Sequence, residues 1–527
     1  MSKSLKNISV VALATVLSRV LGLVRESAAA AVFGASALNS AFTTAFTLPN
    51  LFRRLLGEGA LTAAFVPTLT RELEQNDRAG AFRLVSKVAS WLAVVTTGIV
   101  LLAILVFWNA EAFVQLALRW GVDAETARRW LLGADLAIVL FPYMVLVCLA
   151  AAFSAACQVI GRFAEPALSP VWLNVAILSA LGLGAWWAWD DAARMNLLCV
   201  GVLVGGFLQM AVPAGVLWGE GWRPAFDLRA DERVREIIRL MGPTVIGSAI
   251  YLINISVSRF VGLSLNDAAA TVLNLATRLM ELPIGVFTIA IATVIFPLIA
   301  RHAAKEDWAS LTADYHKGMR LVLVINIPAA IGLALLSEPI IRLLFQHGAF
   351  TASDTALMTP VLVAYAIGLP FISFTSLSLR AFYALRDTAT PVRAAALSFV
   401  VNIGLSVLLM QWLSTVGLAL ASTVAVVAQA AFLQSRLVRK LDGFTALTLV
   451  PSLGKIAIGA VIMAGVVWLG ARGVTMLGLP IKAADLLVVL AVIPLGAAVY
   501  GVALWLLRIE GREDLEQVLA KVRAKFS

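Results

Sequence analysis

The sequence predicts an all-α polytopic membrane protein of about 14 transmembrane helices, built as two six-helix parallel-repeat lobes plus two C-terminal helices. Three observations predict this fold class. Hydrophobic residues make up 61% of the 527 residues and charged residues only 14%, whereas soluble domains average ~45–50% apolar and ~25% charged. The apolar residues form long uninterrupted blocks, and short motifs recur about 228 positions apart.

The apolar blocks predict helices, because they are continuously apolar whereas membrane barrel strands alternate over ~10 residues. A block such as residues 91–108 approaches the ~20 residues that cross ~30 Å of hydrocarbon. The predicted spans lie near 8–33, 38–70, 86–110, 131–158, 168–189, 194–218, 236–262, 268–299, 317–337, 357–384, 391–411, 416–438, 452–472 and 484–508. Arg19 interrupts the first block and no convincing cleavage site follows, so we expect an uncleaved span and not a signal peptide.

The basic residues orient these spans. Of 41 Lys and Arg residues, 27 lie in the termini and the loops on their side, and seven lie in the opposite loops. The positive-inside rule therefore places both termini in the cytoplasm, and most of the net charge of +10 reflects topology, not nucleic-acid binding. The three cysteines and three histidines have neither metal-ligand nor disulfide spacing, so we expect no metal and no cofactor.

An internal duplication divides the chain. The matching pairs are Pro142 and Pro370, Asn174 and Asn402, Pro67 and Pro297, and Arg71 and Arg301. An offset of about 228 residues spans six helices, an even number, so the two copies share one orientation, as in transporters built from parallel repeats with a substrate site between them. We predict an N-lobe over residues 1–220, a C-lobe over 221–440, and two further helices with a cytoplasmic tail over 441–527.

Seven arginines lie inside the predicted spans: Arg19, Arg25, Arg53, Arg54, Arg259, Arg278 and Arg380. Each costs at least ~2.5–3.5 kcal/mol at a helix centre on insertion scales. Arg259 and Arg380 lie within about a turn of a span end, where a long side chain reaches the interface by snorkelling. The other five are deeper, so we expect them to pair with acids or to line water.

Few acids accompany these arginines. Glu26, Glu58 and Glu281 lie within spans, and the i,i+3 spacing of Arg278 and Glu281 allows an ion pair on one helix. If each acid neutralised one arginine, two deep cations would remain. Arginine binds phosphate through two parallel hydrogen bonds and keeps its charge, so the composition favours a polyanionic, phosphate-bearing substrate.

Several runs resemble a known family. They are SRVLGLVRE (18–26), FGASALNSAF (33–42), LPNLFRRLLGEGALTAAFVP (48–67), ATRLMELPIGV (276–286) and FQHGAFT (345–351). The chain resembles, over essentially its whole length, the lipid II flippase family MurJ/MviN of the MOP exporter superfamily. The resemblance implies a non-enzymatic flippase of the bacterial inner membrane that moves undecaprenyl-diphosphate-linked peptidoglycan precursor, lipid II, to the periplasmic leaflet by alternating access. Lipid II, membrane lipids and cell-wall synthesis proteins are the implied partners.

The resemblance also implies site residues. Arg19, Arg25, Arg53 and Arg278 are the implied ligands of the substrate diphosphate. The supporting or gating residues are Arg54, Glu26, Glu58, Glu281, Ser40 and Asn50. Helices 13 and 14 are implied to form a groove for the lipid tail. Many members have an acid, a lysine and an aspartate at the positions of Ser40, Thr47 and Thr277, so the gating ion pairs here must differ. Spans 236–262 and 391–411 contain no acid beyond Glu236, and the sodium site described for some members is not expected.

Two alternatives remain open at this stage. The first is another MOP-type exporter that carries a polyprenyl-linked oligosaccharide. The second is a membrane glycosyltransferase, which would need carboxylates clustered at a membrane edge beside sizeable soluble loops. The longest predicted loops, 109–130 and 219–239, contain only about 20 residues, which favours the transporter.

Overall fold

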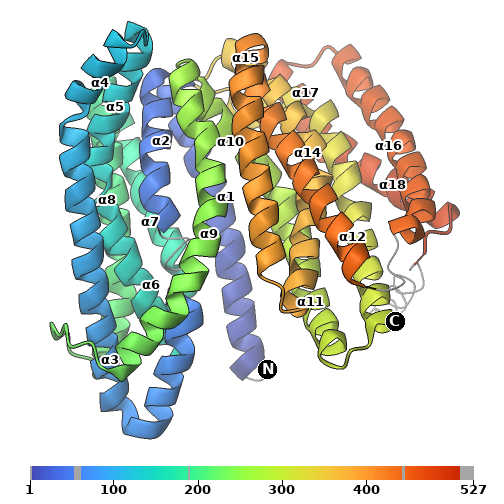
Figure 1. Cartoon of the computed structure of the whole chain (residues 1–527). Helices are drawn as coiled ribbons and strands as arrows, with labels where there is room; N and C mark the ends of the chain where they lie inside the picture. The colour runs from blue at the N-terminus through green and yellow to red at the C-terminus, as the bar shows by residue number, and fades with distance from the viewer. Residues whose placement is uncertain (1–2, 53–60, 188–189, 442–445, 511–527) are drawn as a thin grey trace. The chain divides into compact units, whose positions relative to one another are not determined.

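The structure is a computed structural model that describes residues 3–52, 61–187, 190–441 and 446–510. This described part contains helices and no strand. The chain forms two compact units, one made of the residues up to Thr271 together with His347–Phe350, and the other of Val272–Gln346 and the residues from Thr351 on. Within each unit the long helices run alongside one another (Figure 1).

The first unit contains nine consecutive helices. They are α1 (Lys3–Phe33), α2 (Ala37–Phe52), α3 (Leu61–Trp108), α4 (Ala110–Arg119), α5 (Ala124–Leu140), α6 (Tyr143–Val159), α7 (Ala164–Trp186), α8 (Asp191–Gly219) and α9 (Glu232–Leu265). Helix α3 is interrupted at Asp77, where φ is +68° and the carboxylate accepts the N–H groups of Ala79 and Gly80. Asp77 therefore begins a second helical segment within α3.

The second unit begins within α10 (Ala269–Pro283) and contains the remaining elements. They are a π-helical turn (Ile284–Thr288), α11 (Ile289–Ala304), α12 (Trp308–Leu335), α13 (Ser337–Phe345), α14 (Ala352–Ala384), α15 (Ala389–Lys440), a 3₁₀ turn (Ala446–Leu449), α16 (Val450–Met476), α17 (Ile481–Leu487), a second π-helical turn (Val488–Val492) and α18 (Ile493–Leu506). Helix α15 is two helices joined across a kink at Ser414, whose φ of +49° and ψ of −129° are not helical.

Nine helices among the described residues are long and apolar enough to cross a membrane, and a tenth forms if α5 and α6, bent by 43° at Phe141–Pro142, count as one span. The predicted class, an all-α multi-pass membrane protein, is confirmed; the count of 14 is not. Two of the missing spans have identifiable causes. Helix α15 counts as one helix although the kink at Ser414 divides it into two predicted spans, and residues 53–60 of the predicted span 38–70 lie outside the described residues.

Two short amphipathic helices, α4 and α13, occupy regions where the sequence predicts no membrane span. They begin at Ala110 and Ser337, 227 positions apart, and the helices that follow them begin at Ala124 and Ala352, 228 positions apart. The duplication therefore extends to these connecting helices. The lobe boundaries at residues 220 and 440 stay a prediction.

Apolar side chains form the interior of each unit. In the first unit the core includes Tyr143, Met144 and the three free cysteines Cys148, Cys157 and Cys199, all buried. Large tryptophans near the ends of α3, α4 and α7, namely Trp108, Trp120, Trp186 and Trp187, are exposed. Tryptophan at helix ends is typical of the membrane–water interface.

Two polar contacts bind the C-terminal helices to the rest of the second unit. Arg342 on α13 donates from Nε and Nη2 to the two carboxylate oxygens of Asp485 on α17, at 3.0 and 2.8 Å. Asp485 is only 2% exposed, and the Tyr500 hydroxyl on α18 donates to the Val324 carbonyl at 2.8 Å. The segment predicted as a separate appendage is thus anchored at both α12 and α13.

Candidate functional site

Arg25 on α1 is bound from two sides. Its Nη1 donates to Oδ1 of Asn174 on α7 at 3.1 Å, and its Nη2 lies 2.5 Å from Oε1 of Glu26. The Arg25 and Glu26 side chains are 15% and 14% exposed. Asn174 in turn donates from Nδ2 to the Ser18 carbonyl at 3.1 Å. A guanidinium is therefore held at a defined place between α1 and α7.

Arg19, six residues earlier on α1, is half-buried and makes no hydrogen bond or ion pair within the described residues. A partly buried cation without a protein acceptor is costly in an apolar span. Its charge needs water or an anion to offset this cost, which suits a ligand-binding role better than a structural one.

Arg278 and Glu281 form the second group, on α10 in the second unit. Nη1 of Arg278 donates to Oε2 of Glu281 at 2.8 Å, with side-chain exposures of 27% and 41%. The i,i+3 pairing anticipated from their spacing is confirmed. Thr277 beside them donates to the Leu273 carbonyl of its own helix, at 2.7 Å.

Three predicted site residues, Arg53, Arg54 and Glu58, lie outside the described residues. Asn50 is partly buried near the end of α2. Their assignment to the site stays a prediction.

Arg259 on α9 contacts a residue of α2. Its Nη1 donates to the hydroxyl of Thr47 on α2 at 2.7 Å, and Thr47 is only 4% exposed. Snorkelling of this side chain to the interface stays a prediction; the structure adds a buried hydroxyl within reach of its guanidinium. Arg259 on α9 thus brings a cation to the Thr47 hydroxyl on α2.

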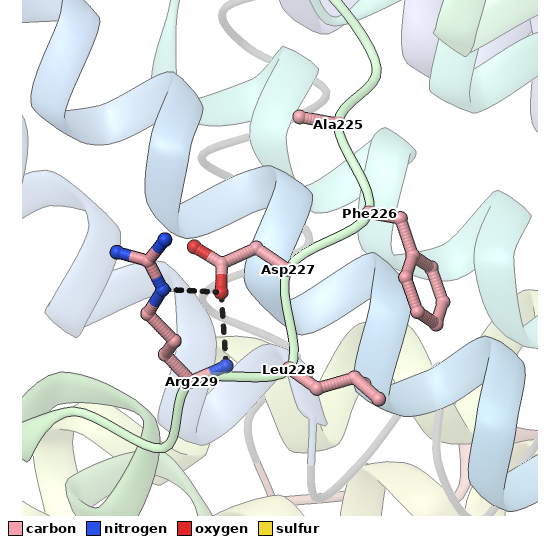
Figure 2. Close-up of a pocket in the computed structure, with 5 residues that line it drawn as sticks. All are labelled: Ala225, Phe226, Asp227, Leu228 and Arg229. Atoms are coloured by element: carbon pink, nitrogen blue, oxygen red, sulfur yellow. Dashed lines mark hydrogen bonds and ion pairs between the residues drawn. The ribbon is translucent and has the colours of Figure 1, made fainter.

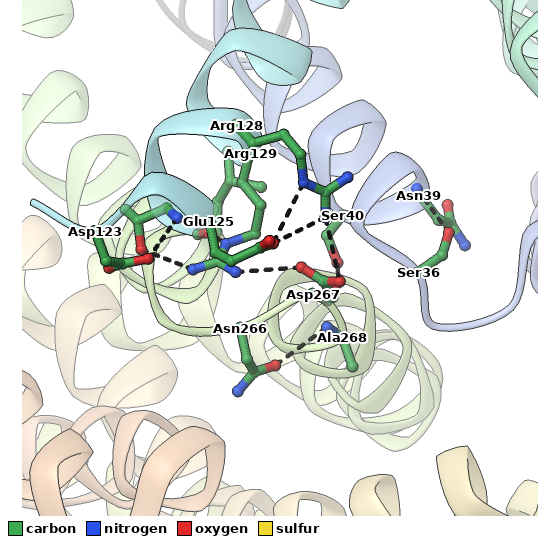
Figure 3. Close-up of polar contacts among 12 residues, drawn as sticks. Ser36, Asn39, Ser40, Asp123, Glu125, Arg128, Arg129, Asn266, Asp267 and Ala268 are labelled. Carbon is green, nitrogen blue, oxygen red and sulfur yellow. Dashed lines mark hydrogen bonds and ion pairs between the residues drawn. The ribbon is translucent and has the colours of Figure 1, made fainter. Parts of the chain in front are cut away.

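Ser40 lies in a polar cluster between α2, α5 and the loop that joins α9 to α10 (Figure 3). Its fully buried hydroxyl lies 2.6 Å from the Asp267 carbonyl and 3.1 Å from the Thr271 hydroxyl, and it accepts the Thr271 N–H at 3.2 Å. The Ser40 hydroxyl thus caps the start of α10.

Arg129 on α5 binds the same loop from the other side (Figure 3). The residue is 6% exposed, and its guanidinium donates to the Leu263 and Ser264 carbonyls at 2.9 and 3.2 Å, and to an Asp267 carboxylate oxygen at 3.2 Å. The exposed Arg128 adds a looser ion pair to Asp267 at 3.6 Å. Asp123 caps α5, and the N–H of Thr126 lowers the pKa of that carboxyl below its ordinary value.

A second loop joins the same unit through two glycines. The N–H of Ala349 donates to the Ala31 carbonyl at 2.7 Å. Gly34 and Gly348 both have positive φ, and a Cβ on either would meet a backbone oxygen, that of Ala349 at 2.6 Å or that of Ala31 at 2.2 Å. The motifs 33–42 and 345–351 therefore meet backbone to backbone. We call the contacts of residues 263–271 and 347–350 with α1, α2 and α5 the loop latch.

A shallow, open depression lies in the α8–α9 loop, lined by residues 225–229 (Figure 2). The Asp227 carboxylate accepts the Arg229 N–H at 2.9 Å and lies 3.7 Å from its Nε. Five consecutive residues of one exposed loop do not form a binding site. Among the described residues no group of three or more His, Cys, Asp or Glu could hold a metal ion.

The sequence reasoning missed Arg129, Asn174 and Asp267. Arg129 was counted only as a charge in an extramembrane loop, and Asn174 only as a mark of the duplication. One signal was present: Arg128 and Arg129 are adjacent on a helix, so they point in different directions and only one can face water readily. Arg129 is the inward-facing residue of this pair. Its partner Asp267 lies 138 positions away, and no nearby sequence pattern indicates the contact.

A family model described as lipid II flippase MurJ matches residues 29–488. This chain belongs to the MurJ family. The family is one of transporters, and the predicted family is therefore confirmed.

Relatives with this family name match the sequence of this chain over most of their own length. A probable lipid II flippase MurJ of Rhizobium meliloti (strain 1021) is 31% identical over 481 residues, covering 91% of this chain and 88% of the relative. The protein of the same name from Rhizobium tropici is 34% identical over 421 residues, covering 78% and 76%. That of Vibrio cholerae is 33% identical over 436 residues, covering 80% of each.

Solved structures show the same fold. A structure titled lipid II flippase MurJ, inward closed conformation, matches with a TM-score of 0.76 at 24% identity, covering 94% of this chain and 97% of that one. An inward-facing multidrug MATE transporter of the MOP superfamily matches with a TM-score of 0.62 at 15% identity, covering 79% and 94%. This MurJ-family chain therefore shares its fold with both structures.

Proposed function

We propose that this protein is a lipid II flippase of the bacterial inner membrane, with both termini in the cytoplasm, and that it carries out transport without covalent chemistry. Arg19, Arg25, Arg53 and Arg278 bind the diphosphate of the substrate, and the polyprenyl tail stays in lipid. Family membership and the names of relatives at 31–34% identity support the substrate.

The single observation that carries the proposal is the pair of arginines on α1. Arg25 is 15% exposed and bound by an amide and one carboxylate, while Arg19 has no acceptor within the described residues. Glu26 offsets at most one of these two charges. Because α1 is predicted from the sequence to cross the membrane, the remaining charge favours an anion, and a diphosphate offers several oxygens to two guanidinium groups.

We propose that the loop latch holds one end of the transporter closed. In the duplicated sequence residues 263–271 and 347–350 belong to the second half, yet they pack with helices of the first half in one compact unit. Movement between two access states requires contacts that form in one state and break in the other. Breaking single hydrogen bonds of hydroxyl, carbonyl and guanidinium groups costs less free energy than opening an apolar core. The loop latch is therefore suited to form in one access state and break in the other.

The alternative function is that of a MOP-type exporter of another polyprenyl-linked oligosaccharide; the fold shared with a MATE transporter is compatible with it. Exporters of cationic drugs need acids at the binding site, and the α1 site instead has two arginines to one acid. A glycosyltransferase would consume lipid II and release a polymer, which a transport assay detects directly.

The test is transport of labelled lipid II by the purified full-length protein in liposomes. We expect the label to cross the bilayer chemically unchanged, and Arg19→Ala and Arg278→Ala proteins to insert normally but to transport little. The same variants should fail to support growth of a flippase-depleted strain. Normal transport and growth with both variants, or conversion of the label into polymer, would refute the proposal.

A further inference from the structure

Asn174 lies at the middle of α7, at the eleventh of 23 residues, and is 4% exposed. Its two polar atoms both contact α1: Oδ1 accepts from Arg25 and Nδ2 donates to the Ser18 carbonyl, each at 3.1 Å. One contact requires an acceptor and the other a donor, so only one orientation of the amide satisfies both. The Asn174 side chain is therefore fixed, and it fixes the Arg25 guanidinium in turn.

The remaining donors of Arg25 are left for a ligand. Guanidinium has five N–H groups, and within the described part of the chain only Asn174 and Glu26 contact this one. Glu26 neighbours Arg25 on the same helix, whereas Asn174 comes from another helix. Asn174 thus sets the direction of the guanidinium relative to α7, which a contact along α1 alone cannot do.

A neutral amide suits this task because it orients a cation without cancelling its charge. A carboxylate at position 174 would form an ion pair with Arg25 and compete with an incoming diphosphate. The duplicated residue Asn402, 2% exposed, plays a different part: its Oδ1 accepts from the Ser422 and Ser406 hydroxyls at 3.2 and 3.5 Å. The asparagine at this repeated position therefore binds a cation in the first half of the chain and hydroxyl groups in the second half.

We propose that Asn174 is a positioning residue of the diphosphate site, which holds the Arg25 guanidinium in the orientation that binds the substrate while leaving its charge available. This inference rests on the proposed function. It assigns to a residue of α7 a role in affinity for the diphosphate.

The test measures the dissociation constant of undecaprenyl diphosphate with the full-length protein in nanodiscs. A hydrogen bond to a charged group is worth ~1.5–3 kcal/mol, so we expect Asn174→Ala to weaken binding roughly tenfold to a hundredfold. Asn402→Ala is the matched control, since it removes an equally buried asparagine, and it should stay within about twofold of the wild type. Asn174→Asp keeps the shape of the side chain and its acceptor oxygen, so it replaces Asn174→Ala in the test if that variant does not fold. It should also bind undecaprenyl diphosphate weakly.

A double-mutant cycle separates positioning from general destabilisation. If Asn174 acts through Arg25, then Arg25→Ala with Asn174→Ala binds no more weakly than Arg25→Ala alone. Two outcomes would overturn the positioning role and leave the proposed function intact. In the first, the losses of affinity from the two substitutions multiply in the double variant. In the second, Asn174→Ala and Asn174→Asp bind as the wild type does while Arg25→Ala binds more weakly. Wild-type binding by Arg25→Ala would overturn both.

Discussion

A Cβ on Gly348 would lie 2.2 Å from the backbone oxygen of Ala31, the oxygen that accepts the Ala349 N–H at 2.7 Å. Real Cβ atoms essentially never approach so closely. The α13–α14 loop therefore docks on the end of α1 only because position 348 carries no side chain. This relationship gives the motif 345–351 a physical role in the loop latch.

Gly348→Ala should impair growth in a flippase-depleted strain and lower the melting temperature of the purified protein. Gly478→Ala is the matched control: Gly478 has φ of +63° against +56° at Gly348, but no atom lies within 4 Å of its Cβ position. Both variants carry a left-handed strain of roughly 1–2 kcal/mol, and only Gly348→Ala adds a backbone clash. Equal effects of the two variants would contradict the docking role.

Arg129→Ala should release the α9–α10 loop. It leaves buried carbonyls and a hydroxyl without their charged donor, at a cost of roughly 2–3 kcal/mol. Arg128→Ala, whose side chain is 52% exposed, should cost less than about 0.5 kcal/mol. The measurement is the rate at which a thiol reagent labels Thr271→Cys, a site 2% exposed, in a protein whose native cysteines are buried. Labelling no faster in Arg129→Ala than in Arg128→Ala would contradict the latch.

Arg259→Ala should destabilise the protein by roughly 1–2 kcal/mol, more than a snorkelling side chain would, because the Thr47 hydroxyl loses its charged donor. The comparison is Arg380→Ala, where the guanidinium lies 5.5 Å from the Phe296 ring centre and the expected loss is about 0.5 kcal/mol. Thermal unfolding of Arg259→Ala, Thr47→Val and the double variant measures the coupling. Additive effects would show that the contact contributes nothing.

Asp387, in the turn between α14 and α15, should make stability depend on pH. Burial alone raises its pKa, but hydrogen bonds from Lys440 and Thr390 outweigh this and lower the pKa from 3.8 to about 2. Because the pKa is lower in the folded state, the Asp387 carboxylate contributes its full stabilisation when the pH is above the ordinary pKa of the group. That stabilisation is lost as the pH falls from about 4 through 2. We expect about 1–2 kcal/mol at neutral pH.

The measurement for Asp387 is the melting temperature in detergent, compared between the wild type and Asp387→Asn. The difference between the two proteins should be constant above about pH 5 and should disappear near pH 2. A difference that persists unchanged at low pH would show that Asp387 acts through something other than its charge.

The class of fold was predictable because it depends on local composition. Helices α7 and α8, of 23 and 29 residues, each contain an 18-residue window whose mean hydropathy, 1.6 and 2.0, suits a membrane span. Helix breaks were less predictable. Ser414 has φ of +49° with no glycine or proline in place. Residues 71–83, for which the sequence predicts a loop, are helical on both sides of a break at Asp77.

Among the candidate site residues, pairs close in sequence were predictable and distant ones were not. Arg278 and Glu281 lie one turn apart on a helix, so their ion pair follows from spacing alone. Arg25 contacts Asn174 across 149 positions, and Arg259 contacts Thr47 across 212. No periodicity in the chain encodes which helix faces which, so these partners had no signal.

By itself the sequence determined that this protein is a helical membrane protein with motifs repeated about 228 positions apart and arginines in its apolar spans, because hydropathy and repeats are properties of the chain. The tertiary structure decided what each polar group does. Asn174 became the support of Arg25, Ser40 a cap on α10 and Gly348 a docking point, because these roles depend on which backbone and side-chain atoms helix packing brings within about 3 Å.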